Sequence, residues 1–152
     1  MTELTTYSAA IALMEDRAQS GWLALSSTFT DMAEIRSPAN ELTFGKAPLD
    51  KIWSRISTQN VQGTKTTVGS DINSKARYTY NGLLFIQIFG SMHMPGFPIV
   101  GRLIAEGMRN VFRSPPMSDS VVYRNARIDE MTNDNTFYQY RVICEYEFDE
   151  LG

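Results

Sequence analysis

The sequence predicts an α+β domain in which two main helices pack against one mixed, largely antiparallel β-sheet of about four to five strands. Three observations indicate this fold class. Two segments repeat apolar residues at helical spacing, and several others alternate apolar and polar residues with the period of a strand. Between the first two predicted strands lies a long polar segment, which predicts an arm.

Length and composition predict a single globular domain over residues 1–152. Apolar residues make up 43% and charged residues 20%, and no tract has the composition of a disordered tail. The N-terminal segment lacks a basic start, and Glu15 and Asp16 interrupt its apolar run. We therefore expect neither a signal peptide nor a membrane-spanning helix, and we expect synthesis in a cytoplasm.

Charge is distributed unevenly along the chain. Residues 1–50 carry seven acids and three bases, residues 51–127 carry three acids and ten bases, and residues 128–152 carry seven acids and one base. The bases of the middle segment are scattered, so we do not expect sequence-specific nucleic-acid binding. A basic middle between acidic ends instead favours packing against other copies of the chain or against complementary protein faces.

The first helix is predicted near the N-terminus. Ser8 or Thr6 can cap it, and its apolar residues recur near helical spacing from Ile11 to Leu25. We expect it to end around Ser26.

Residues 30–50 contain two prolines and a glycine between short apolar pieces. This composition predicts a loop, with at most a short edge strand at Leu42 to Phe44. Residues 51–58, KIWSRIST, alternate with the period of a strand and form the first long strand of the prediction.

Residues 60–76 are rich in glycine, threonine and serine, carry Lys65 and Lys75, and contain almost nothing to bury. Structureless connections of this length are uncommon in a compact domain unless they are functional or disordered. The segment is therefore the best candidate for a flexible contact arm. A hairpin tip without any role remains the alternative.

Residues 77–90, RYTYNGLLFIQIFG, form the most strand-like segment of the chain. The dipeptide Asn81–Gly82 is a signal for a two-residue hairpin, whereas the alternative is one long strand with a bulge at Gly82. The part that follows is apolar on both faces except at Gln87. That pattern predicts a central strand in a sheet covered on both sides.

Residues 97–112 predict a second helix that packs on the sheet, because their apolar residues recur on one face. Pro115 and Pro116 cannot continue a helix and should end it. The face predicted to be buried consists of Val100, Leu103, Ile104, Gly107 and Val111.

Residues 120–129 and 136–150 are predicted to form the last two strands, paired as an antiparallel hairpin. Cys144, the single cysteine, falls on the apolar face of the second strand, where a cysteine usually behaves as a small buried hydrophobe. Glu145 and Glu147 share the other face, which is typical of a solvated or partner-facing surface and not of a catalytic pair.

Met92, His93 and Met94 are candidate soft metal ligands, and His93 is the only histidine of the chain. In an extended segment the two methionines point one way and His93 the other, so the three converge only in a tight turn. The flanking glycines and proline favour a mechanical role as the joint before the second helix. We therefore predict no catalytic residue, no cofactor site, no metal site and no enzymatic activity.

The order of these features is informative as a whole. An amphipathic helix is followed by an edge piece at Asn40 to Phe44, a proline and the strand PLDKIWSRI, and the arm then leads to a strand with Arg77, Tyr78 and Gly82. A glycine-containing turn, a helix ending in Phe112 and a closing hairpin ending in FYQYRVICEYEF complete the order. This order resembles the tail terminator, or tail completion, proteins of long-tailed bacteriophages, which include phage-related domains of unknown function. The resemblance extends from about Ile11 to Phe148.

The resemblance implies a structural virion protein without catalysis. Such a subunit is expected to form a hexameric ring that caps the head-proximal end of the tail tube, stops tube polymerisation and provides the surface for head–tail joining. The implied partners are further copies of the chain, the tail tube protein and head–tail connector proteins, with DNA passing through the ring and no membrane. The implied location is the neck region of the virion tail, after assembly in the host bacterial cytoplasm.

The resemblance also implies one continuous strand through Asn81 and Gly82, against the plain reading of that dipeptide. Two groups of residues become candidates for protein interfaces. Lys65, Lys75 and Arg77, on or beside the arm, are expected to contact the tail tube or the adjacent subunit. Arg102, Glu106 and Arg109 are expected on an exposed stripe of the second helix that faces a partner or the lumen.

Two alternatives stay open. A head completion or connector subunit of the neck can share the same general fold and the habit of forming rings. An alternative of another class is a small-ligand or metal-binding protein that uses the turn at His93.

Overall fold

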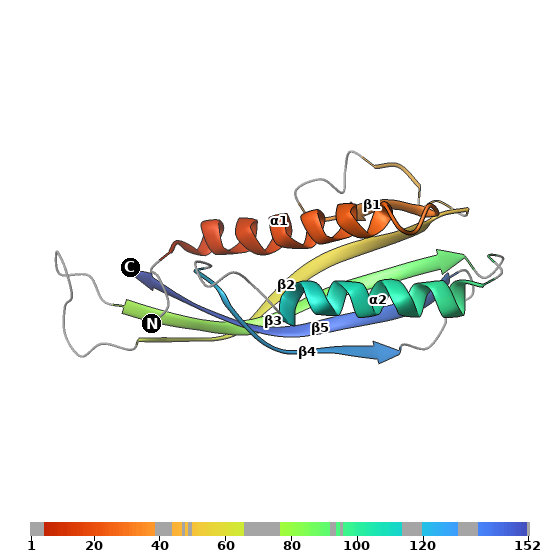
Figure 1. Cartoon of the computed structure of the whole chain (residues 1–152). Helices are drawn as coiled ribbons and strands as arrows, with labels where there is room; N and C mark the ends of the chain where they lie inside the picture. Colours follow the sequence, from red (N-terminus) through yellow and green to blue (C-terminus); the bar gives the residue numbers. More distant parts are fainter. Residues whose placement is uncertain are drawn as a thin grey trace.

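The computed structural model (Figure 1) has two helices packed on one mixed sheet, which confirms the predicted α+β fold class. The structure describes residues 5–38, 44–46, 48, 50–65, 77–91, 94, 96–113, 120–130 and 137–151. The elements in these residues are α1 (Tyr7–Ser26), β1 (Met32–Arg36), β2 (Ile52–Lys65), β3 (Arg77–Ser91), α2 (Phe97–Arg113), β4 (Val122–Glu130) and β5 (Phe137–Leu151).

The sheet has the strand order β1-β2-β3-β5-β4. β1 pairs with β2 in parallel, and the other neighbouring strands pair antiparallel. β3 is therefore the central strand, as its continuous apolar sequence predicted, and β4 and β5 form the predicted antiparallel pair.

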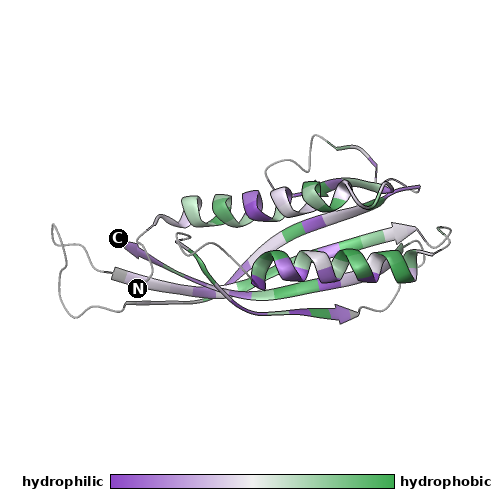
Figure 2. Cartoon of the chain, viewed as in Figure 1, coloured by the Kyte–Doolittle hydropathy of each residue, from purple (hydrophilic) through white to green (hydrophobic). Residues whose placement is uncertain are grey.

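The core lies between the two helices and one face of the sheet. Hydrophobic and hydrophilic segments follow one another along α2 in Figure 2, as expected for a helix that buries one face. The side chains that α1 buries follow at intervals of four residues, and β3 contributes alternate residues. Buried members of this core include Ala10, Met14, Ala18 and Trp22 of α1, Leu84, Ile86 and Ile88 of β3, and Phe97, Ile104, Met108 and Phe112 of α2.

The start of α1 is fixed by two acceptors. Thr6 is the capping residue, not Ser8, and its Oγ1 accepts a hydrogen bond from the backbone N–H of Ala9 at 3.1 Å. Glu150, near the end of β5, accepts the backbone N–H of Tyr7 at 2.6 Å. A carboxylate at a helix N-terminus is favourable because it faces the positive end of the helix dipole.

The loop expected over residues 30–50 is wrong in part, because it contains β1. This strand adds to the edge of the sheet in parallel with the first residues of β2. Trp22 of α1 donates a hydrogen bond from Nε1 to the carbonyl oxygen of Ala33 at 2.8 Å, which joins the helix to β1. Of the expected edge strand at Leu42 to Phe44, only Phe44 belongs to the described residues, and it lies in a bend.

β2 continues to Lys65, well beyond the predicted end of the strand. The expected arm at residues 60–76 is therefore wrong over residues 60–65, which pair with β3 as far as Lys65 opposite Tyr78. The side chains of this part are largely exposed, so its sequence is polar and lacks the alternation that predicts a strand. The strand forms here because its backbone pairs with that of β3. Residues 66–76 lie outside the described residues.

β3 is continuous through Asn81 and Gly82, so the hairpin suggested by that dipeptide is wrong and the single long strand is confirmed. The expected bulge is displaced to the opposite strand. The pairing register shifts between Asn60 and Gln62 in β2, which makes Val61 the extra residue.

A second bulge lies in β4, where the register with β5 shifts between Arg124 and Arg127. Asn125 in this bulge has φ 55°, a left-handed conformation that asparagine tolerates. Cys144 of β5 lies opposite, with its Sγ 3.5 Å from the carbonyl oxygen of Arg124. The thiol is buried, as predicted, and burial raises its pKa to about 11.

Neither of the two described helices packs on the second face of the sheet, so the cover expected on that side of β3 does not come from them, although Trp53, Phe89 and Ile143 are buried there. Phe85 lies on this face and is only half-buried, because it alternates with the core residues of β3. Long arginine side chains cover the aromatic rings here: the guanidinium carbon of Arg141 lies 5.4 Å from the ring centre of Phe85, and that of Arg55 6.0 Å from Phe89.

α2 has nearly the predicted length, but its predicted buried face is wrong at Leu103, which is 45% exposed. Ile104 is fully buried, as predicted. Gly107 and Val111 are half-buried because they face α1 instead of the sheet. The apolar residues of α2 therefore pack partly on the sheet and partly on α1, and Leu103 faces neither of them.

Candidate interaction surface

The predicted arm residues lie at one end of the sheet. Lys65 ends β2 opposite Tyr78, and Arg77 begins β3 opposite Leu151 of β5. The backbones of Lys65 and Arg77 are thus brought to neighbouring strands. Their side chains, and the whole of Lys75, lie outside what the structure describes.

The predicted helix residues follow one another along one side of α2. Arg102 is exposed, whereas Glu106 and Arg109 are half-buried. The Nε of Arg109 is buried and makes no hydrogen bond within the described part of the chain. Of the expected exposed stripe, Arg102 alone is fully exposed.

Two apolar side chains adjoin Arg102. Ile99 is 64% exposed and Leu103 is 45% exposed, and a spacing of four residues places them on the same side of α2. Large apolar side chains with this exposure are few in the described part of the chain; the others are Tyr7, Leu23 and Val61. We call Ile99, Arg102 and Leu103 the α2 patch.

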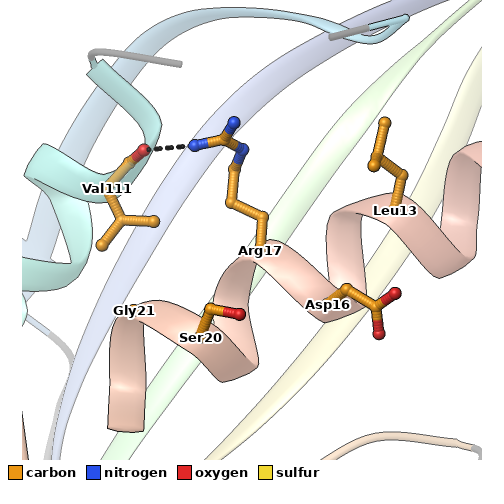
Figure 3. A pocket seen from close by; sticks show the side chains of 6 residues that line it. All are labelled: Leu13, Asp16, Arg17, Ser20, Gly21 and Val111. Carbon is orange, nitrogen blue, oxygen red and sulfur yellow. Dashed lines mark hydrogen bonds between the residues drawn. The ribbon is translucent and has the colours of Figure 1, made fainter. Parts of the chain in front are cut away.

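A groove of about 420 Å³ lies between α1 and α2 (Figure 3). Arg17 of α1 reaches across it and donates from Nη1 to the carbonyl oxygen of Val111 at 3.3 Å, in the last turn of α2. Carbonyls there lack helical partners and carry the negative end of the dipole, so they favour a cation. In Figure 3, Asp16 points away from α2. The groove is thus bridged by an internal contact.

The two helices meet through a reciprocal pair of glycines. A Cβ atom at Gly21 of α1 would lie 2.5 Å from Cγ2 of Val111, and a Cβ atom at Gly107 of α2 would lie 2.6 Å from Cδ2 of Leu25. Each helix therefore inserts an apolar side chain where the other has only hydrogen. This contact fixes the spacing of the helix layer and hence the positions of the surfaces on it.

A second groove, of about 380 Å³, lies along the flank of α1 opposite Arg17. Most of the surface that lines it is apolar, and Glu15 and Asp16 line the end farther along α1; Asp16 also lines the first groove. We call it the α1 groove. Its lining residues are Tyr7, Ser8, Ile11, Ala12, Glu15 and Asp16.

A hollow of about 480 Å³ lies on the helix-free face of the sheet, between Val61 and the charged side chains of β4 and β5. Its charges are already paired: Arg124 lies 2.5 Å from Glu147, and Arg127 lies 3.4 Å from Glu145. Exposed pairs of this kind contribute little to stability and leave little net charge to attract a ligand.

The titratable groups with a clearly shifted pKa do not form a catalytic arrangement. Burial is the main cause that raises the pKa of Cys144 to about 11, that of Tyr146 to about 12, and that of Tyr80 above its usual value. All three groups stay protonated at neutral pH. At that pH none of them is in the anionic form in which a thiol or a phenol acts as a nucleophile or a base.

The metal alternative at His93 falls outside the described residues, as do Met92 and Pro95. Among the residues that the structure places, no three histidine, cysteine, aspartate or glutamate side chains are grouped so as to hold a metal ion. In the same residues, neither helix combines the length and apolar character needed to cross a membrane.

Comparison with known families finds no family model that matches the chain, and comparison with curated proteins finds no relative. A functional proposal for this chain therefore rests on the order of its elements and on the α2 patch and the α1 groove of the helix layer.

The sequence did not reveal the α2 patch or the α1 groove. Leu103 was assigned to the core, although the four-residue spacing of Ile99 and Leu103 around Arg102 could have marked an apolar patch with a cation. Nothing in the sequence indicated a groove beside Ile11 and Ala12, because that depends on where α1 lies on the sheet.

Proposed function

We propose that this chain is a structural virion protein that forms a ring on the head-proximal end of a bacteriophage tail tube. The ring stops tube polymerisation and provides the surface for head joining. Its partners are further copies of the chain, the tail tube protein and head–tail connector proteins. It acts in the neck region of the virion and is assembled in the host bacterial cytoplasm.

The continuity of β3 is the observation that carries the proposal. The Asn81–Gly82 dipeptide is a hairpin signal, and the family resemblance required one long strand there instead. β3 runs unbroken from Arg77 to Ser91. The order of helix, strands, helix and closing strand pair is also the order that the resemblance implies.

The distribution of surfaces gives further support. A ring of identical subunits needs two different surfaces that complement each other and a rotation that closes. The subunit has a patch with an arginine on α2 and a groove with two carboxylates on α1.

The direct test uses tail tubes isolated from the phage that encodes the chain. Purified chain is added to the tubes, followed by fresh tube subunits, and tube ends and lengths are measured by electron microscopy. We expect ring-shaped density at one end of each tube and no further growth there. Tubes that remain uncapped and keep growing would contradict the proposal, whereas binding to isolated connectors but not to tubes would favour the connector alternative.

The role of the arm residues is tested in the same assay. A chain with Lys65→Glu and Lys75→Glu is expected to keep its thermal unfolding midpoint and to cap far fewer tubes, because two cations that face the tube or the next subunit become anions. Unchanged capping would remove these lysines from the interface and leave the ring proposal in place.

A further inference from the structure

We propose that the ring is closed by a head-to-tail contact in which the α2 patch of one copy docks in the α1 groove of the next copy. The inference rests on the proposed ring function and adds the surfaces that meet. The α2 patch consists of Ile99, Arg102 and Leu103, and the α1 groove lies beside Ile11, Ala12, Glu15 and Asp16.

The two surfaces complement each other in polarity. Ile99 and Leu103 expose apolar surface that a neighbouring protein would remove from water, which is favourable by about 25 cal/mol for each Å². The α1 groove offers an apolar floor in a space of about 380 Å³. Aliphatic side chains fit such a space, because most of the surface that lines the groove is apolar.

The two surfaces also complement each other in charge. α2 contains three arginines and one glutamate, and α1 contains two acids and one arginine. The arginine of α1, Arg17, is directed to Val111 of α2, so the outer flank of α1 is left acidic. Within the described part of the chain, Arg102, Glu15 and Asp16 form no ion pair.

The positions of the helices make the contact heterologous. α1 packs against β1 and β2, whereas α2 packs against β3, β4 and β5. The two helices thus lie toward opposite edges of the sheet (Figure 1). A copy that uses its α2 patch on one neighbour keeps its α1 groove free for another, and repetition of this contact closes a ring when the rotation between copies is right.

Charge reversal tests the contact. One variant carries Glu15→Arg and Asp16→Arg, a second carries Arg102→Glu, and a third combines all three changes. In the tube-capping assay we expect a loss of at least tenfold in capped ends for the first two, because like charges then face each other across every contact. We expect recovery for the third, and also for an equimolar mixture of the first two, in which reversed and natural surfaces alternate around the ring.

All three positions lie outside the core, so each variant is expected to unfold at nearly the wild-type temperature, which serves as the folding control. Capping at the wild-type level by either reversed variant would overturn the inference. Failure of the combined variant to recover would overturn it equally. If the wild-type chain caps no tubes, both the proposed function and this inference are contradicted. If the wild-type chain caps tubes and the reversed variants cap them equally well, the proposed function stands and this contact is contradicted.

Cross-linking gives an independent reading of the geometry. A chain with Ala12→Cys and Leu103→Cys is oxidised on tube ends and run on a non-reducing gel, with the two single variants as controls. Each copy then carries one cysteine at each of two contacts, so we expect a ladder of trimers and larger species. Each single variant should stay monomeric, because only one side of each contact then carries a cysteine and Cys144 is buried. A double variant that stops at dimers would contradict the head-to-tail contact.

Discussion

Tyr146 lies across Gly82, so that its hydroxyl passes from β5 over β3 and donates a hydrogen bond to Oδ1 of Asn60 on β2. A Cβ atom at position 82 would overlap the ring and hydroxyl of Tyr146 and the carbonyl oxygen of Gln59. The glycine that suggested a turn is therefore a strand residue. Because it has no side chain, the ring of Tyr146 can lie over β3 and connect three strands.

Replacing this glycine should be costly. Gly82→Ala is expected to lower the free energy of unfolding by about 2–4 kcal/mol, because neither the buried tyrosine ring nor the backbone oxygen can move freely. Urea denaturation measures the change. The matched control is Gly45→Ala, since a Cβ at this exposed glycine meets nothing within 4 Å. Equal effects at the two positions would contradict the role assigned to Gly82.

Alkaline pH should destabilise the fold in two overlapping steps, caused by the two groups whose pKa is raised most. Burial raises the pKa of Cys144 from 9.0 to about 11 and that of Tyr146 from 10.0 to about 12. A raised folded-state pKa means that the unfolded chain loses its proton first. The contribution of each group is thus complete below its unfolded pKa and is lost as pH rises, from 9 to 11 for the thiol and from 10 to 12 for the phenol.

Each step is worth up to about 3 kcal/mol, since one pKa unit corresponds to about 1.4 kcal/mol. Urea denaturation at a series of pH values measures the loss. Cys144→Ala should remove the first step and Tyr146→Phe the second, whatever either change does to stability at pH 7. A pH profile that is the same for both variants and the wild type would show that other groups cause the alkaline loss.

The contact between the helices should depend on Gly21. Gly21→Ala is expected to destabilise the chain by about 1–3 kcal/mol in thermal or urea unfolding, although alanine favours a helix, because β-branched Val111 has little rotamer freedom to move away. Gly107→Ala should cost less, since it meets the flexible end of Leu25. Adding Val111→Ala to Gly21→Ala should recover part of the loss, and no recovery would contradict the steric explanation.

Arg36 should be more important than an exposed arginine. It is 6% exposed, lies 2.7 Å from Glu34, and has its guanidinium carbon 4.9 Å from the ring centre of Trp53. Arg36→Ala is expected to lower the free energy of unfolding by about 3 kcal/mol because it leaves Glu34 uncompensated, and Arg36→Lys by about 1–2 kcal/mol because it loses the planar stacking.

The matched control for Arg36 is Arg127→Ala, which removes an exposed ion pair with Glu145 and should cost less than about 1 kcal/mol. Urea denaturation of the three variants checks this order. If Arg36→Ala and Arg127→Ala lower the free energy of unfolding equally, burial does not make the Arg36–Glu34 ion pair contribute more to stability than an exposed pair.

Strong local patterns made most of the fold predictable. The long apolar run around Ile86 indicated a central strand, and the alternation around Val142 indicated a strand with one buried face; both are confirmed. Thr6 was one of two capping residues that the sequence offered, and it is the one used. In each case the signal lies within one element and does not depend on its neighbours.

Other features depend on distant contacts and were missed for that reason. β1 is short, and its place is decided by pairing with β2 and by the hydrogen bond from Trp22 to Ala33. The polar half of β2 is ordered by the backbone of β3. Leu103 was misassigned because α2 divides its apolar side between the sheet and α1, which periodicity alone does not show.

The two bulges bear on how the subunit associates. Val61 interrupts the pairing of β2, which has no described strand on its outer side beyond Arg55, and the bulge at Asn125 interrupts the outermost strand on the other side. A broken hydrogen-bond ladder is a poor template for a strand of another molecule. The bulges therefore disfavour fibril-like growth by addition of strands and leave association to specific side-chain contacts, which can stop at a finite number of copies.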